Sequence, residues 1–136
     1  MTTEVAMVTN NKNFYARLES ELREEHIRLR GPYEGTEGHL QTCIYPVVVV
    51  DMLLLSKSAG PSYENGLQAI RMLRASANHD STIFATAVGG NTAPVLGNCG
   101  VQAVEAGATK FVKLPKRLSV DELVVNIVAA VGKLRF

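Results

Sequence analysis

The sequence predicts a three-layer α/β/α sandwich, with helices on both faces of a five-stranded parallel sheet. Short runs rich in β-branched residues alternate along the chain with amphipathic stretches at helical spacing. The run at residues 47–50 is continuously β-branched, which is typical of a strand buried on both faces of a parallel sheet. Helices that join parallel strands cross over the sheet, so helices are expected on both of its faces.

Each predicted strand is a short apolar run, and a predicted helix follows it. The strands are expected at residues 4–8, 26–30, 47–50, 82–87 and 109–113. The helices are expected at residues 13–26, 31–43, 65–76, 93–107 and 119–136, and glycines leave any helix in the second segment short. Apolar residues at helical spacing define buried helix faces: Phe14, Leu18 and Leu22; Leu67, Ile70 and Leu73; Val120, Leu123, Val124, Ile127, Val128 and Val131.

Residues that favour helix ends mark several of these boundaries. Asn13 is the candidate N-cap of the first helix. Pro94 lies near the start of the fourth helical segment and Gly107 at its end, which is the usual order of these two residues. Ser119 and Glu122 have the spacing of a capping box at the start of the last helix.

Length and charge limit the class of protein. The 136 residues are enough for one domain, residues 1–136, with a core of its own. Fourteen basic and thirteen acidic residues nearly balance, which argues against a protein that coats nucleic acid or a membrane surface. The start of the chain lacks the pattern of a signal peptide, and Cys43 and Cys99 form no CxxC pair. We therefore expect a cytoplasmic protein with reduced thiols.

One acidic residue interrupts the most apolar stretch of the chain. Asp51 directly follows the run at residues 47–50, and an isolated ionised carboxylate is very costly to bury without a partner. In doubly wound α/β folds, functional groups collect beyond the carboxyl ends of the strands. We therefore expect Asp51 at that edge of the sheet, where the buried strand emerges.

Several stretches, taken in order, resemble the receiver domains of two-component response regulators. Asp51 closes the third strand, "NGLQAIRML" is similar to the family's "DGLELLRRL", and "EAGATKFVKLP" is similar to its "EAGADDYLTKP". The resemblance covers nearly the whole chain and implies the flavodoxin-like (CheY-like), doubly wound fold. It implies that Asp51 occupies the phosphoacceptor position, Thr86 that of the switch hydroxyl and Phe111 that of the switch aromatic. It also implies a cis peptide bond between Leu114 and Pro115.

The chain departs from this family where the family's chemistry needs charge. Thr9 and Asn10 stand at the acidic pair that binds Mg²⁺ in the family, and neither can replace an ionised carboxylate. Leu114 stands at the family's lysine, with Lys113 one residue earlier. Because successive side chains of a strand point to opposite faces, Lys113 is expected to point away from Asp51, unless a bulge turns it back.

These departures favour a degenerate receiver, or pseudo-receiver, that lacks Mg²⁺-dependent phosphorylation. A phosphoryl group adds roughly two negative charges, and the neutral pair offers no metal site to offset them. We expect a non-enzymatic protein without a cofactor or metal. Asp51 is then held by backbone N–H groups, by Asn10 or Thr86, or by water.

Two connections differ from the family pattern. The segment between Asp51 and Gly66, "MLLLSKSAGPSYEN", is longer than its counterpart, and it either shields Asp51 or offers a contact surface. The segment after the fourth strand is rich in glycine, and Gly97 and Gly100 are expected to weaken the helix there. This change favours a remodelled surface for protein partners.

Three functions remain open. The first is a signalling module that docks to protein partners, with a homodimer through the last helix as one form. The second is a receiver that accepts a phosphoryl group on Asp51 from a histidine kinase. The third is a flavodoxin-like small-molecule binder, although "TNNKNFY" lacks the glycines of a phosphate-binding loop.

Two further groups of residues suggest contacts or ligands. Lys113, Lys116 and Arg117 form a basic cluster that is either a solvated turn or a contact for an acidic protein. His39 and Cys43 are too few for a zinc site.

Overall fold

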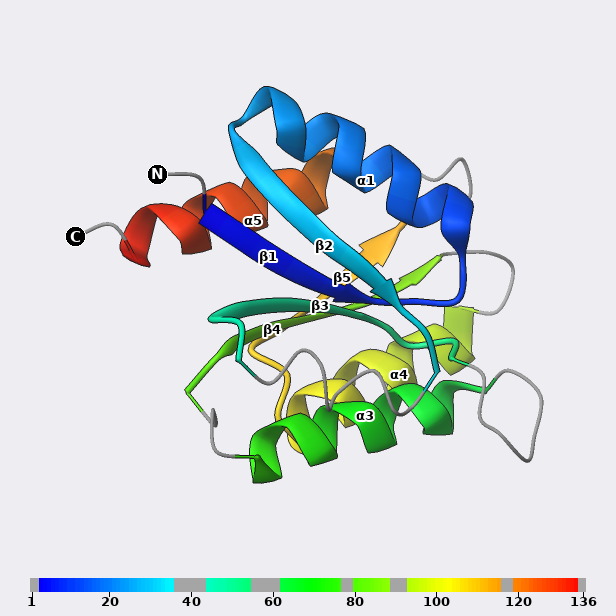
Figure 1. The fold of residues 1–136 in the computed structure, drawn as a ribbon. Helices are drawn as coiled ribbons and strands as arrows, with labels where there is room; N and C mark the ends of the chain where they lie inside the picture. The colour runs from blue at the N-terminus through cyan, green and yellow to red at the C-terminus, as the bar shows by residue number, and fades with distance from the viewer. Residues whose placement is uncertain are drawn as a thin grey trace.

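The computed structural model describes residues 3–35, 44–54, 62–76, 80–88, 93–115 and 119–134, with the backbone alone for residues 88 and 93–98. Strands and helices alternate along these residues (Figure 1). The elements are β1 (Thr3–Val8), α1 (Lys12–Glu24), β2 (Ile27–Tyr33), β3 (Val47–Asp51), α3 (Tyr63–Ala75), β4 (Thr82–Val88), α4 (Ala93–Ala106), β5 (Lys110–Leu114) and α5 (Asp121–Leu134).

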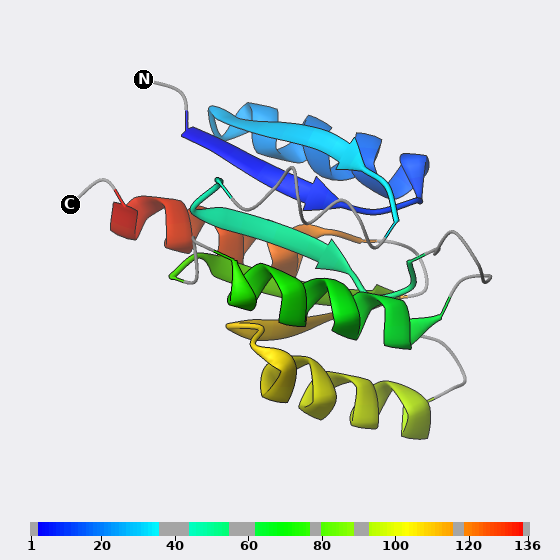
Figure 2. The same cartoon turned by 60° about the horizontal axis from the view of Figure 1, so that its bottom comes forward.

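The strands form one parallel sheet in the order β2-β1-β3-β4-β5. Helices α1 and α5 cover one face, and α3 and α4 cover the other, as the two views together show (Figures 1 and 2). The predicted three-layer sandwich with a five-stranded parallel sheet is therefore confirmed. The order changes direction between β1 and β3, which places the carboxyl end of β3 at the usual position of functional groups in such sheets.

Strand β3 separates two apolar layers. Val47 and Val49 pack in the layer beneath α1 and α5, whereas Val48 and Val50 pack in the layer beneath α3 and α4. All four side chains are completely buried. The continuous β-branched run is thus a strand buried on both faces, as the sequence predicts, and it ends at Asp51.

The N-cap of the first helix differs from the prediction. Asn11 caps α1, because its Oδ1 accepts from the Phe14 N–H at 3.0 Å, and Asn13 lies inside the helix. Asn11 has the extended backbone that an N-cap requires, with φ −93° and ψ 99°. Both asparagines are suitable cap residues, so residue type alone could not choose between them.

The second strand is longer than predicted. It continues through Gly31 and Pro32 to Tyr33, where the sequence suggested the start of a short helix. Backbone pairing with β1 therefore prevails over the local turn signal of Gly31 and Pro32, with a register shift between Ala6 and Val8. The rest of that predicted helix, at residues 36–43, lies outside the described residues.

Two details near β5 and α5 also differ. Helix α5 begins at Asp121, and the Val124 N–H donates to the Val120 carbonyl, so the helix starts later than the predicted capping box at Ser119. The Leu114–Pro115 bond is not cis, contrary to the expectation from the family. The trans form is the intrinsic preference of X–Pro bonds. The cis bond among the described residues joins Gly31 to Pro32.

Gly66 allows the first turn of α3 to lie directly against the backbone after β3. A Cβ atom at this position would lie 2.3 Å from the Met52 carbonyl oxygen and 2.5 Å from the Met52 Cα. Real Cβ atoms do not approach backbone so closely, so a larger residue must move α3 or the chain after Asp51. The glycine of the "NGLQ" stretch therefore sets the distance between this helix and the functional edge of the sheet.

We predict that Gly66→Ala lowers the free energy of unfolding by about 1–3 kcal/mol, the usual cost of overpacking. Gly132→Ala is the matched control, because a Cβ there meets nothing within 4 Å in α5. That variant should gain roughly 0.5–1 kcal/mol from helix propensity. Urea unfolding measures both, and a Gly66→Ala protein as stable as the parent would contradict the close approach.

Candidate functional site

Asp51 ends β3 and is buried, with 7% of its surface exposed. Thr9 follows β1, and Val8 of β1 pairs with Val50 of β3, so the two polar residues emerge side by side. The Thr9 hydroxyl donates to Asp51 Oδ2 at 2.7 Å. The Leu53 N–H donates to Oδ1 at 3.2 Å. Each carboxylate oxygen therefore accepts one hydrogen bond from the protein.

The Thr9 hydroxyl is oriented by a second hydrogen bond. The Asn11 N–H donates to Thr9 Oγ1 at 3.0 Å, so a lone pair is occupied and the hydroxyl proton is directed to Asp51. The Thr9 N–H donates to the Tyr33 carbonyl at 2.9 Å, which fixes the backbone as well. The connection between β1 and α1 thus forms a short chain of donors that ends on the carboxylate.

Burial raises the pKa of Asp51 above its ordinary value, because the ionised form loses hydration. The hydrogen bonds from Thr9 and Leu53 oppose this shift only in part, since both stabilise the ionised form. No lysine or arginine of the described residues contributes to the shift. Asp51 is therefore a buried acid stabilised by neutral donors instead of by a cation.

The expected partners of Asp51 are only partly correct. A backbone N–H does hold the carboxylate, but the side-chain donor is Thr9, and not Asn10 or Thr86. The Asn10 amide oxygen instead accepts from the Gly35 N–H at 3.2 Å. Thr9 was expected in this pocket only as a poor metal ligand, and it is instead the side-chain donor to Asp51.

Thr86 lies beside Asp51 in the sheet. The two residues are register partners, and the Met52 N–H donates to the Thr86 carbonyl at 2.8 Å. Thr86 is completely buried, and its Oγ1 makes no hydrogen bond with any described residue. Buried hydroxyls nearly always have a partner. This site therefore contains a hydroxyl group with unused hydrogen-bonding capacity next to the acid.

The register of β5 separates Lys113 from Asp51. Lys113 pairs with Ala87, which packs in the α3/α4 layer, whereas the row of Asp51 continues to Val112 in the α1/α5 layer. The pairing of β4 with β5 runs without a shift, so no bulge turns Lys113 towards the acid. Lys113 is exposed, and Leu114, which the resemblance places at the family's lysine position, is completely buried in the core.

The residues around Asp51 do not fit a divalent metal ion. Mg²⁺ is held mainly by carboxylate oxygens and water, and Asp51 supplies the one carboxylate of this pocket within the described residues. Thr9 directs its proton to Asp51, and the Asn10 amide oxygen accepts from Gly35, so both are engaged in protein contacts. Residues 3–35, 44–54, 62–76, 80–88, 93–115 and 119–134 contain no cluster of three or more histidine, cysteine, aspartate or glutamate residues suited to a metal.

Phe111 packs against α4 and is half-buried. A Cβ atom at Gly100 would lie 2.9 Å from the Phe111 ring, so this glycine lets α4 approach β5. Gly100 was predicted only to weaken the helix, and the structure gives it a packing role as well. The position of Gly97 is described by its backbone alone.

Tyr63, the first residue of α3, is a neighbour of the site that the sequence did not single out. Burial raises the pKa of its hydroxyl, and the charges of Cys99 and Asp51 raise it further. Burial also raises the pKa of the Cys99 thiol. No sequence pattern links these residues, because only the packing of α3 and α4 on β3 brings them together.

The residues on either side of the segment 55–61 are fixed by burial and by one backbone bridge. Met52 and Leu54 are buried, Leu53 is 44% exposed, and Leu54 forms an antiparallel bridge with Ser62. Residues 55–61, which were expected to shield Asp51 or contact a partner, lie outside the described residues. So do Lys116 and Arg117 of the basic cluster, and His39 and Cys43.

No described helix is long and apolar enough to cross a membrane. No protein-family model and no curated protein sequence matches the chain.

Solved structures similar to this chain are receiver domains. A protein of Chloroflexus aurantiacus described as a response regulator is 18% identical, with a TM-score of 0.73 over 97% of this chain and 99% of that chain. The beryllofluoride-activated NtrC4 receiver domain dimer is 22% identical, with a TM-score of 0.69 over 96% and 97%.

A third example is the receiver domain of the sensor histidine kinase PA1611 from Pseudomonas aeruginosa PAO1, which has a magnesium ion coordinated in its active-site cleft. It is 19% identical, with a TM-score of 0.67 over 95% of this chain and 99% of that chain. Sheet order, helix placement and these similarities agree: the chain has the fold of response-regulator receiver domains.

Proposed function

We propose that this chain is a pseudo-receiver, a signalling module of the two-component type that acts by binding proteins without Mg²⁺-dependent phosphorylation. The observation that carries the proposal is the hydrogen bond from Thr9 to Asp51 Oδ2 at 2.7 Å. It fills the side of the carboxylate where the family places its acidic pair and metal. The carboxylate is thereby stabilised within the resting fold, and no lysine or arginine of the described residues acts on it.

Electrostatics support this proposal. Two unit charges about 4 Å apart repel by roughly 4 kcal/mol at the effective dielectric constant of a protein surface. A phosphoryl group that approaches ionised Asp51 meets at least this repulsion, since it carries more than one negative charge. A metal ion and a lysine offset such repulsion in the family. Here Leu114 is buried in the core, and Lys113 is on the opposite face of β5.

Contacts with proteins are then the means by which the domain acts. Helix α5 carries two apolar side chains that remain exposed, Val125 at 67% and Leu134 at 51%. A homodimer through this helix is one such contact, and the NtrC4 neighbour is itself described as a dimer. The proposed location of this signalling protein is the cytoplasm.

One observation favours a second function, a phosphorylatable receiver. The Thr86 hydroxyl is completely buried without a hydrogen-bond partner among the described residues, next to Asp51. Such a hydroxyl could donate to an oxygen of a phosphoryl group on Asp51. The missing countercharge outweighs this advantage, because one neutral hydrogen bond contributes only about 0.5–1.5 kcal/mol.

The first test is intact-mass analysis after incubation with acetyl phosphate and Mg²⁺. We expect no added phosphate, because the residues around Asp51 do not fit a metal ion and Lys113 lies on the opposite face of β5. A receiver domain that carries the acidic pair serves as the positive control. A gain of one phosphate that disappears in Asp51→Asn would establish the second function instead.

A second test restores the acidic pair. In the absence of metal, Thr9→Asp combined with Asn10→Asp should lower the melting temperature, because three carboxylates then repel one another beside β3 and the Thr9 donor is lost. Mg²⁺ should recover the melting temperature of the double variant, whereas it should leave the parent unchanged at matched ionic strength. Thermal melts with and without MgCl₂ measure both effects, and a parent protein that is equally stabilised by Mg²⁺ would contradict the proposal.

The raised pKa of Asp51 predicts that its ionisation lowers the free energy of unfolding, by an amount that depends on pH. Its folded pKa lies above the unfolded value of about 3.9, so the folded protein binds more protons between these two values. Stability therefore falls as pH rises through this window. Asp51→Asn should be more stable than the parent at pH 7, and the difference should shrink as pH falls towards 4. Urea unfolding across this range measures it, and a variant less stable at pH 7 would refute the predicted cost.

Thr9→Val provides the companion measurement at pH 7. It removes the hydroxyl that stabilises the ionised acid, so it should cost about 1.5–3 kcal/mol in the parent. The same change should cost less in an Asp51→Asn background, because no charge then depends on the donor. Equal costs in the two backgrounds would mean that Thr9 stabilises the fold independently of Asp51.

A further inference from the structure

Strand β2 forms one edge of the sheet, and no described strand pairs with its outer side. The Tyr15 hydroxyl donates to the Leu29 carbonyl at 2.9 Å, so this carbonyl of the edge is already occupied. Within a strand, the N–H and C=O of one residue point to the same side, and alternate residues share that side. Since Leu29 O points outward, the Leu29 N–H and the backbone of Ile27 also face outward.

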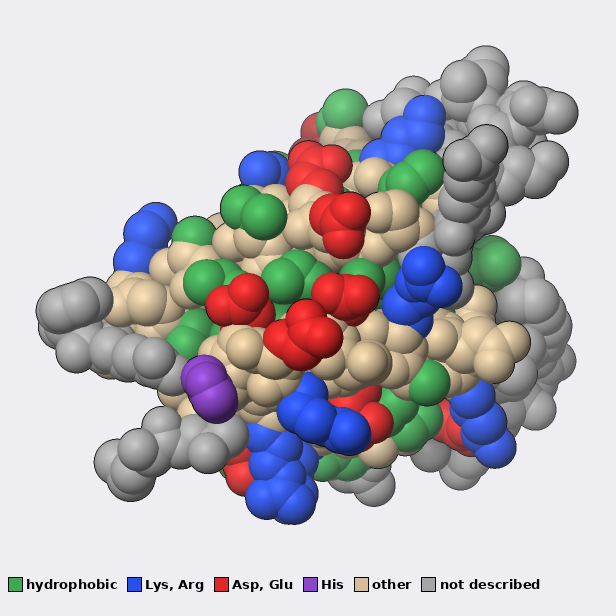
Figure 3. All heavy atoms as spheres, turned by 90° about the horizontal axis from the view of Figure 1, so that it is seen from above, with side chains coloured by type: hydrophobic (Ala, Val, Ile, Leu, Met, Phe, Trp, Pro, Cys, Tyr) green, Lys and Arg blue, Asp and Glu red, His purple; other side chains and the backbone are tan. Residues whose placement is uncertain are grey.

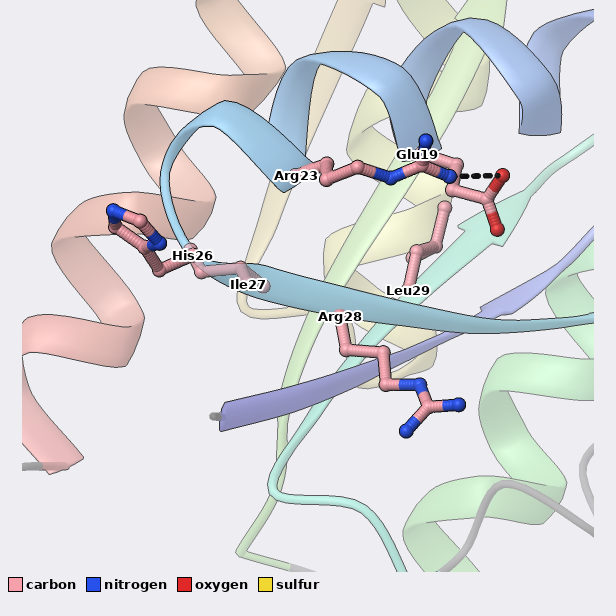
Figure 4. Close-up of a pocket in the computed structure, with 6 residues that line it drawn as sticks. All are labelled: Glu19, Arg23, His26, Ile27, Arg28 and Leu29. Carbon is pink, nitrogen blue, oxygen red and sulfur yellow. Dashed lines mark hydrogen bonds and ion pairs between the residues drawn. The ribbon is translucent and has the colours of Figure 1, made fainter. Parts of the chain in front are cut away.

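A hollow of about 420 Å³ lies along this part of the edge. It is lined by Glu19, Arg23, His26, Ile27, Arg28 and Leu29. Figure 4 shows Glu19 and Arg23 paired on α1 at one side of the strand, while Arg28 extends from the strand to the other side. The hollow therefore runs along a strand edge with different side chains above and below it.

The two faces of this edge differ in chemistry. Ile27 and Leu29 pack in the α1/α5 layer, and their neighbours in the sequence, Arg28 and Arg30, point to the opposite face. On that opposite face the inner neighbour β1 supplies an acid, because Arg30 Nε lies 3.6 Å from Glu4 Oε2. The Arg28 side chain is exposed and makes no hydrogen bond or ion pair with another described residue.

We propose that this edge binds an extended segment of a partner protein in which acidic and apolar residues alternate. The segment adds to β2 as a further strand beside residues 27–29. Side chains of an added strand alternate between the two faces, so those on the side of Arg28 are acidic and those beneath α1 are apolar. The backbone of Ile27 and the Leu29 N–H supply the hydrogen bonds, and Arg28 supplies the charge that selects the segment.

Charge decides between an acidic partner and a second copy of this chain. Basic side chains on an exposed edge hinder pairing between identical edges, because they bring like charges together. The same side chains attract an acidic segment. Figure 3 shows acidic side chains along the middle of the α1/α5 face, with basic side chains on several sides of them. Ile27 lies at the start of β2, whereas Asp51 lies at the end of the parallel strand β3, so the two sites are at opposite ends of the sheet. Binding at the edge therefore does not depend on the state of Asp51.

The test uses the full chain and a short blocked peptide of alternating glutamate and valine. We expect the peptide to shift the amide NMR signals of Ile27, Arg28 and Leu29, and a peptide with lysine in place of glutamate to leave them unchanged. Arg28→Glu should weaken the glutamate peptide roughly 5–10-fold, the effect of exchanging an exposed attraction for a repulsion. Arg71→Glu is the matched control, because Arg71 is an exposed arginine that lies on α3, and it should leave the affinity unchanged.

Three outcomes would overturn the proposal. The first is the absence of shifts at residues 27–29. The second is an equal loss of affinity in Arg28→Glu and Arg71→Glu, which would indicate general attraction to positive charge. The third is self-association of the parent that is altered by Arg28→Glu in sedimentation, which would make a second copy the occupant.

Discussion

The hydrogen bond between Thr9 and Asp51 joins residues that are 42 positions apart, and it depends on the pairing of β1 with β3. The completely buried valines of β3 carry the chain to the edge of the sheet, where Asp51 is still buried. A carboxylate in this position needs donors. The connection between β1 and α1 supplies one through Thr9, and the chain after β3 supplies another through Leu53. The opening turn of α1 and the end of β3 are thus arranged around one acid.

Thr9 and Asn10 are neutral, and this lowers the electrostatic repulsion in the pocket around Asp51. An acidic pair beside Asp51 would place three carboxylates together, and their repulsion would make the apo fold depend on a cation. Thr9 adds no charge and contributes a hydrogen bond to Asp51 instead. Part of the desolvation cost remains, because burial still raises the pKa of Asp51 and the Thr86 hydroxyl makes no hydrogen bond among the described residues.

Much of the fold follows from periodicity in the sequence. The β-branched run predicts a strand buried on both faces, and the alternation of a strand places Lys113 on the face opposite Asp51; both agree with the structure. The hydrogen bond to Thr9 was not predictable, because sheet register and side-chain rotamers decide which neighbour reaches the acid. Local signals were also ambiguous where several suitable residues are adjacent. Asn11 and Asn13 both suit a cap, and Gly31 and Pro32 lie within a strand.

The packing of this fold and its chemistry depend on different residues, so one can change while the other is kept. Leu114, which the resemblance places at the family's lysine position, adds to the α1/α5 core, while Gly66 and Gly100 keep the close approaches of α3 and α4. Exchanging a charged group for an apolar one in a core removes a desolvation cost and adds buried apolar area. An apolar residue at position 114 therefore adds to the stability of this fold. Under the proposed function, surfaces such as the β2 edge with Arg28 then determine what the domain binds.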